Sequence, residues 1–125
     1  MSEHIEVKNI TSRELEEMIK KKRERHYQII DVRQLEEYGQ GHIPGATLIP
    51  VFQIEHRLDE IPQDRDLIFY CRSGARSRAA TMFVRDSGLV VKAIYNLAHG
   101  FSYWEGDEVL GLPRLRVFET TTDMD

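Results

Sequence analysis

The only cysteine of the chain, Cys71, opens a segment with the residue types of a nucleophile site, Cys71-Arg72-Ser73-Gly74-Ala75-Arg76-Ser77. An apolar run at 67–70 precedes it, and residues 78–84 place apolar side chains four apart, as on a helix. We therefore expect a six-residue turn, from Cys71 to Arg76, between a strand and a helix N-terminus. Unpaired amides and a positive dipole at that end stabilise a thiolate and attract an anion.

A lone cysteine can also be a small buried hydrophobic residue. Glycine, two serines and two arginines beside Cys71 argue against that interpretation. Arg72 and Arg76 add positive charge close to the thiol, although either could instead pair with a surface carboxylate, Arg72 more readily. Ser77 could cap the following helix, and Ser73 could form a hydrogen bond within the turn.

The composition indicates one domain with a proper core, since the chain has 125 residues and 41% of them are apolar. A net charge of −4 gives no general attraction for nucleic acid or an anionic membrane. A single cysteine excludes an internal disulfide and a metal site built on several cysteines. With no signal-like start and no apolar run near ~20 residues, we expect a cytoplasmic protein.

The elements that must position Cys71 follow from hydrophobic spacing and turn residues. Strands are predicted at 5–7, 27–32, 47–49, 67–70 and 90–97, and helices after Thr11, at 34–38, between Val51 and Ile61, and at 78–84. This alternation predicts an α/β fold with a mainly parallel five-stranded sheet and helices on both faces. Ligands of such sheets bind beyond the carboxyl ends of the strands, where Cys71 is expected.

Two segments allow more than one interpretation. The basic run at 20–25 fits the solvated end of a helix better than a nucleic-acid patch. We expect the domain to span residues 1–118 and an acidic, mobile tail to span 119–125. The alternating apolar residues at 114–118 could pack on the domain or contact a partner.

Three further motifs accompany the cysteine segment: Asp31-Val32-Arg33 with Glu36, Gly41-His42-Ile43-Pro44-Gly45-Ala46, and Asn96-Leu97 with Gly100 and Trp104. Together with the segment at 71–77 they resemble the rhodanese family of single-domain sulfurtransferases. The resemblance covers about residues 5–113.

The resemblance implies a rhodanese-like three-layer fold and transfer of a sulfane sulfur. Thiosulfate or a related persulfide would load Cys71, and a thiol, cyanide or a protein partner would remove the sulfur. The loop residues Arg72, Ser73, Gly74, Ala75, Arg76 and Ser77 would bind substrate, with the two arginines on the sulfonate. Asp31 and Arg33 would brace the loop. His42 and Trp104 would be structural, and no cofactor or metal is implied.

The sequence departs from the family pattern at Ala98-His99-Gly100, where a pair of glycines is common. Two rival functions stay open. A phosphatase that shares this fold has a Cys-x5-Arg loop, whereas Cys71 to Arg76 is Cys-x4-Arg. A non-catalytic interaction module is the second rival, and the intact loop with its cysteine argues against it.

Overall fold

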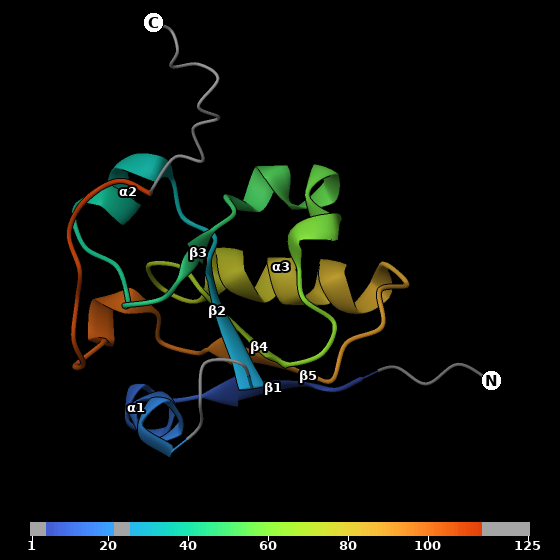
Figure 1. The fold of residues 1–125 in the computed structure, drawn as a ribbon, viewed down its shortest axis with the longest axis horizontal. Coiled ribbons are helices and arrows are strands. Elements are labelled where there is room, and N and C mark those ends of the chain that lie inside the picture. The colour runs from blue at the N-terminus through green and yellow to red at the C-terminus, as the bar shows by residue number, and fades with distance from the viewer. Residues whose placement is uncertain (1–4, 22–25, 114–125) are drawn as a thin grey trace, which may run out of the picture.

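The computed structural model describes residues 5–21 and 26–113, which form a single α/β domain (Figure 1). The strands are β1 (Val7–Ile10), β2 (Tyr27–Asp31), β3 (Thr47–Leu48), β4 (Asp66–Tyr70) and β5 (Ala93–Leu97). They make one sheet in the order β1-β5-β4-β2-β3, and every pairing is parallel. The predicted five-stranded parallel sheet is therefore confirmed.

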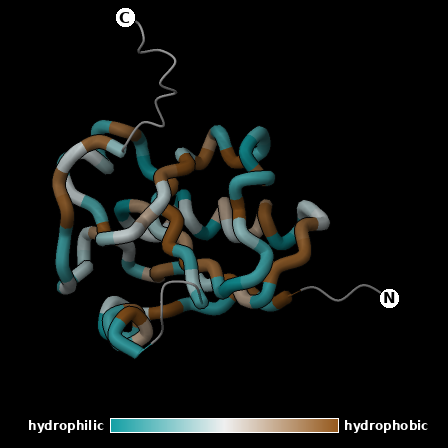
Figure 2. The backbone as a smooth tube through the Cα atoms, viewed as in Figure 1, coloured by the Kyte–Doolittle hydropathy of each residue, from teal (hydrophilic) through white to brown (hydrophobic). Residues whose placement is uncertain are grey.

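Helices cover both faces of the sheet, and each face has its own apolar core. On one face lies α1 (Ser12–Lys21), whose Leu15 packs with Ile29, Ile68 and Trp104. On the other face lies α3 (Ala75–Asp86), together with a 3₁₀ helix, η2 (Val51–His56) (Figure 1). Figure 2 shows hydrophobic stretches along the central strands. A sheet buried on both faces explains the nearly unbroken apolar strands β2 and β4.

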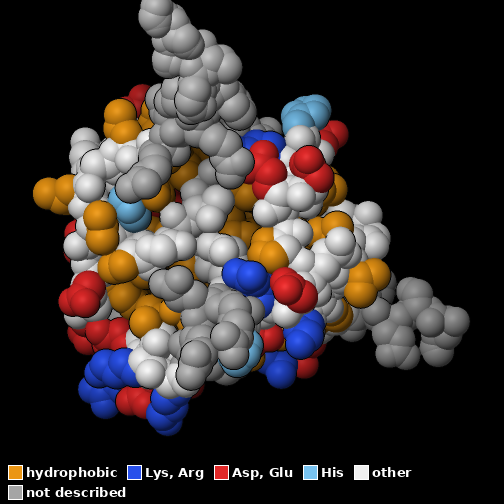
Figure 3. All heavy atoms as spheres, in the orientation of Figure 1, with side chains coloured by type: hydrophobic (Ala, Val, Ile, Leu, Met, Phe, Trp, Pro, Cys, Tyr) orange, Lys and Arg blue, Asp and Glu red, His pale blue; other side chains and the backbone are white. Residues whose placement is uncertain are grey.

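The start of α1 follows the capping box predicted from Thr11 and Glu14. The Thr11 amide donates to the Glu14 carboxylate at 2.9 Å, and the Glu14 amide donates to the Thr11 hydroxyl at 3.1 Å. The helix ends in Lys20 and Lys21, and basic side chains gather over the α1 region at the lower left of Figure 3. Residues 22–25 of the basic run lie outside the described residues.

The predicted helix between Val51 and Ile61 is wrong in type. Two 3₁₀ helices occur there, η2 and η3 (Leu58–Glu60), and they are separated at Arg57. The apolar positions are three apart within each half, 51 to 54 and 58 to 61, and three is the repeat of a 3₁₀ helix. Ile54 and Ile61 are the buried members of these pairs.

Element ends differ from the predictions by a few residues. The last strand begins at Ala93 rather than Val90, and Val90 is 74% exposed. The first strand begins at Val7 and extends to the buried Ile10. In the part of the chain that the structure describes, no helix is both long enough and apolar enough to span a bilayer. The segments at 114–118 and 119–125 fall outside that part.

Candidate active site

Cys71 follows the last residue of β4, at the carboxyl edge of the sheet, as expected. The helix begins earlier than predicted, because Gly74 is the N-cap of α3 and Ala75 its first residue. The predicted six-residue turn is therefore shorter, and α3 starts inside the motif. This early start turns the amides of the first helical turn back toward the Cys71 side chain.

Hydrogen bonds from the loop converge on the Cys71 sulfur. The Gly74 amide lies 3.1 Å from Sγ, the Ser77 amide 3.3 Å, and the Ser77 hydroxyl 3.5 Å. Burial of Cys71 opposes ionisation, but these bonds and the Ser73 amide outweigh it, so the pKa of the thiol lies below its ordinary value. The site therefore favours a thiolate, or another single anionic atom in its place.

The loop carbonyls bond outward to the segment that follows β5. The Phe101 amide donates to the Cys71 carbonyl at 2.8 Å, and the Ser102 amide donates to the Arg72 carbonyl at 3.0 Å. The side chain of Asn96, at the end of β5, donates to the Gly74 carbonyl at 3.3 Å. These hydrogen bonds direct the loop carbonyls away from the Cys71 sulfur, and the loop amides point toward it.

Two glycines permit the close contact between these segments. Gly74 has φ of 103°, and a Cβ there would lie 2.2 Å from the Ala98 carbonyl oxygen. Gly100 has φ of 69°, and its Cβ would lie 2.2 Å from the Arg72 carbonyl oxygen. Neither position accepts another residue without displacement of the backbone. The departure from the family pattern at His99 leaves both contacts intact, since His99 is exposed and its ring lies against Tyr103.

Ser77 is not a helix cap, contrary to one interpretation of the sequence. It lies within the first turn of α3, is fully buried, and approaches the Gly74 carbonyl as well as Cys71. Its shortest contact is with the side-chain oxygen of Asn96, at 2.6 Å. Asn96 was predicted as part of a motif without a role, and only the three-dimensional structure brings it under the loop.

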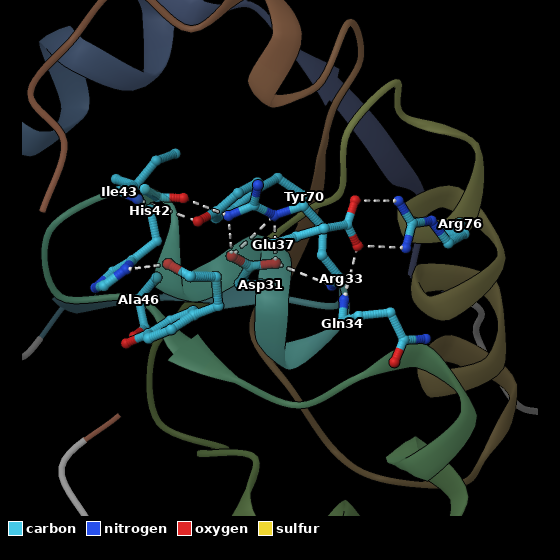
Figure 4. Close-up of polar contacts among 11 residues, drawn as sticks. Asp31, Arg33, Gln34, Glu37, His42, Ile43, Ala46, Tyr70 and Arg76 are labelled. Atoms are coloured by element: carbon cyan, nitrogen blue, oxygen red, sulfur yellow. Dashed lines mark hydrogen bonds and ion pairs between the residues drawn. The ribbon is translucent and has the colours of Figure 1, made fainter. Parts of the chain in front are cut away.

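Arg76 pairs with Glu37, on the short helix α2 (Leu35–Gly39). Two bonds of 3.0 and 3.1 Å join the guanidinium to the carboxylate, and Figure 4 shows the two groups facing each other. The hydrogen bond from Arg76 holds the pKa of Glu37 at about 2. The arginine expected to pair less readily is thus the paired one, while Arg72 has no ion pair within residues 5–21 and 26–113. The motif residue of the sequence analysis, Glu36, is the chain neighbour of Glu37, the residue that pairs with Arg76.

Asp31 and Arg33 form a buried ion pair. The Arg33 guanidinium bonds both Asp31 carboxylate oxygens at 2.8–3.1 Å, and Nη2 also donates to the Gly41 carbonyl at 2.7 Å. Its central carbon lies 4.5 Å from the centre of the Phe101 ring. Burial opposes the charge on Arg33, and Asp31 more than compensates, so the pKa of Arg33 is raised. Neither residue is hydrogen-bonded to the Cys71 sulfur, and a bracing role for the pair stays a prediction.

His42 and Trp104 have structural contacts. His42 stacks on the Tyr38 ring at 3.6 Å, and its Nδ1 lies 2.9 Å from the Tyr38 carbonyl oxygen. Trp104 is buried in the core under α1, and its Nε1 donates to the Asp107 carbonyl at 2.9 Å. Both residues hold segments that flank the site.

Comparisons with known proteins agree with this fold and loop. The family model of the rhodanese-like domain matches residues 11–107, so the chain belongs to the rhodanese family. It is 41% identical over 76 residues to a sulfurtransferase of Allochromatium vinosum, covering 61% of this chain and 69% of that one. It is 33% identical over 103 residues to the putative sulfurtransferase YtwF of Bacillus subtilis, covering 82% of this chain and 95% of that one.

Among solved structures, a rhodanese-like domain protein of Staphylococcus aureus matches with a TM-score of 0.73 and 30% identity. The match covers 86% of this chain and 100% of that one. In four of the curated relatives the match spans between 41% and 69% of their own length.

Proposed function

We propose that the protein is a sulfurtransferase that carries sulfane sulfur on Cys71. The Cys71 thiolate attacks the outer sulfur of thiosulfate, the S–S bond breaks, and sulfite leaves with its electron pair. A persulfide anion stays on Cys71 until a thiophilic acceptor removes the terminal sulfur. The observation that supports this best is the convergence of the Gly74 and Ser77 amides on Sγ at 3.1 and 3.3 Å.

In this proposal the loop from Arg72 to Ser77 stabilises negative charge on sulfur before and after transfer. Backbone amides supply most of that stabilisation, and Arg72 and Arg76 attract the anionic donor. The Asp31–Arg33 pair keeps the neighbouring segment in place without contact to the donor. A cytoplasmic location belongs to the proposal, since a lone reactive thiol is kept reduced there.

The mass of the intact protein tests the reaction class. Treatment with thiosulfate should add one sulfur atom to the wild type, and cyanide should remove it and release thiocyanate. Cys71→Ser, which keeps a similar side chain without the thiol, should gain no mass and form no thiocyanate. Sulfur transfer that persists in purified Cys71→Ser would overturn the proposal.

The two rival functions predict different results in the same samples. A phosphatase would hydrolyse aryl phosphates through Cys71, and an interaction module would neither load sulfur nor turn over. The Cys-x4-Arg spacing and the amides already within 3.3 Å of Sγ favour one bound sulfur over a tetrahedral phosphate. We therefore expect negligible phosphatase activity. Inserting one glycine between Ala75 and Arg76 should weaken sulfur transfer and widen the loop toward phosphate binding.

A further inference from the structure

A cavity of about 260 Å³ opens beside the cysteine loop, between α2 and the turn after β5. Its wall includes Arg33, Glu37, Gln40, Arg72, Phe101 and Ser102, but not Cys71. Two of these residues bond directly to the loop: the Phe101 amide to the Cys71 carbonyl, and the Ser102 amide to the Arg72 carbonyl. The cavity therefore adjoins the cysteine loop, and Cys71 itself is not part of its wall.

Among the charged residues that line this cavity and their ion-pair partners, one positive charge is left over, and the nearby Glu108 is not part of the wall. Arg33 is paired with Asp31, and Glu37 is paired with Arg76. Arg72 lines the cavity and makes no ion pair or side-chain hydrogen bond within the described ranges. Gln40 and Ser102 are exposed polar residues on the same wall. The balance favours a ligand with a single negative charge.

One nitrogen of the Arg33 guanidinium, Nη1, has no hydrogen-bond partner among the described residues. The bonds of Arg33 to Asp31 and Gly41 use Nε and Nη2 only. Among the described residues every fully buried side-chain nitrogen or oxygen has a hydrogen-bond partner. Nη1 has none, so it must be accessible, and Arg33 lines this cavity. Asp31 and the Phe101 ring fix the guanidinium, so its free donors are already oriented.

We propose that this cavity binds the carboxylate of a small thiol that accepts the sulfur from Cys71, and this rests on the proposed function. The acceptor thiolate attacks the terminal persulfide sulfur, the S–S bond breaks, and Cys71 leaves as a thiolate while the acceptor becomes a persulfide anion. The oxygens of thiosulfate lie only two bonds from the transferred sulfur, and Cys71 does not line this cavity. A carboxylate several bonds from its thiol fits instead.

Single-turnover transfer from protein loaded with thiosulfate tests this inference. The loaded protein is freed of donor and mixed with 3-mercaptopropionate or with its uncharged amide, 3-mercaptopropionamide. Each rate is divided by the concentration of the acceptor's thiolate form. The ratio of the carboxylate rate to the amide rate is then compared with the same ratio for a small persulfide in solution. The wild type should prefer the carboxylate over the amide more than the solution reaction does. Equal preference in protein and solution would overturn the inference.

Gln40→Glu adds one negative charge to the cavity wall and should reduce that preference. The expected reduction is about three- to tenfold, the effect of one charge roughly 5–8 Å away at a partly exposed site. The matched control is Gln63→Glu, the same change outside the cavity, where the side-chain oxygen that accepts the Val90 amide is kept. The control should behave as the wild type. Equal slowing of both thiols by Gln40→Glu would contradict the inference.

Two further outcomes are distinguishable. If Gln40→Glu slows loading by thiosulfate and leaves the acceptor preference unchanged, the cavity serves the donor and the inference is wrong. If Cys71 accepts no sulfur at all, the proposed function fails. Binding of propionate to the unloaded protein then tests separately whether the cavity binds a carboxylate. Propionate should change the NMR chemical shifts of the Gln40 and Ser102 amides until the site is saturated, and Gln40→Glu should weaken this binding. That result would support the inference. Unchanged shifts would overturn it.

Discussion

The side-chain oxygens of Ser77 and Asn96 lie 2.6 Å apart beneath the cysteine loop, both fully or nearly fully buried. The amide nitrogen of Asn96 faces the Gly74 carbonyl, so its oxygen must face Ser77 and accept the hydroxyl proton. The same hydroxyl lies 3.5 Å from the Cys71 sulfur. One proton thus has three acceptors within reach, the Asn96 oxygen, the Gly74 carbonyl and the sulfur, and we infer that it turns to the sulfur when Cys71 ionises.

Replacement of Ser77 by alanine tests this relationship. Ser77→Ala should raise the pKa of Cys71, because the thiolate loses one donor. It should also lower the free energy of unfolding by about 1–3 kcal/mol, because the buried Asn96 oxygen loses its partner. The pH midpoint of iodoacetamide alkylation, below the free-cysteine value of about 8.5 in the wild type, measures the first effect.

Ser87→Ala is the matched control for this variant, since Ser87 bonds a helix carbonyl at the opposite end of α3. It should leave the alkylation midpoint unchanged. A midpoint that stays or falls in Ser77→Ala would mean that the hydroxyl remains turned to Asn96 in the thiolate state.

Gly74 and Gly88 form a natural pair for separating backbone strain from steric contact. Both have a left-handed conformation, with φ of 103° and 93°. A Cβ added at Gly74 would collide with the Ala98 carbonyl, whereas a Cβ added at Gly88 would have no atom within 4 Å. Gly88→Ala should cost about 1–2 kcal/mol of unfolding free energy and keep sulfur loading. Gly74→Ala should cost clearly more and abolish loading, because the Ala98 carbonyl must move. Urea unfolding and intact mass measure the two effects, and equal costs would contradict this account.

The Glu37–Arg76 pair predicts how stability depends on pH. The folded pKa of Glu37, about 2, lies below the unfolded value of about 4.3, so the stabilisation is fully present above pH 4.3 and is lost toward pH 2. Glu37→Gln should therefore destabilise by about 1–2 kcal/mol at neutral pH, and the difference should shrink below pH 4.3. Glu36→Gln, the same change one residue away and outside the ion pair, is the matched control.

The charge of Arg76 is expected to act on the donor as well as on Glu37. Arg76→Gln should lower kcat/KM about tenfold or more for thiosulfate, and much less for an uncharged polysulfide donor. The double variant Glu37→Gln/Arg76→Gln removes the carboxylate that the single variant leaves unpaired. If the loss for thiosulfate disappears in the double variant, the single variant acted through the stranded Glu37 rather than through Arg76.

Local chemistry made much of this site predictable. The strand before Cys71 and the helix after it follow from hydrophobic spacing, and the motif composition points to a thiolate in a cradle of amides. The start of α3 was harder to predict from the sequence, because Gly74 and Ala75 lie in a run of polar and small residues that favours no particular helix start. The break at Arg57 was missed because a spacing of three and four also suits an α-helix.

Pairings between distant segments could not be predicted. Glu36 and Glu37 are adjacent and chemically alike, and only the direction of α2 decides which one meets Arg76. Asn96 reaches Ser77 because β5 lies next to β4 in the sheet, an order that spacing along one chain does not contain.

The complete burial of Cys71 has a kinetic consequence. A sulfur without exposed surface reacts only in those molecules whose loop is transiently open, so every reagent samples the same small open population. The alkylation rate above the thiolate pKa, divided by that of a free thiolate, then gives the open fraction directly. Substrate turnover cannot exceed the opening rate, and the protein's one oxidisable thiol is shielded from peroxide by the closed fraction.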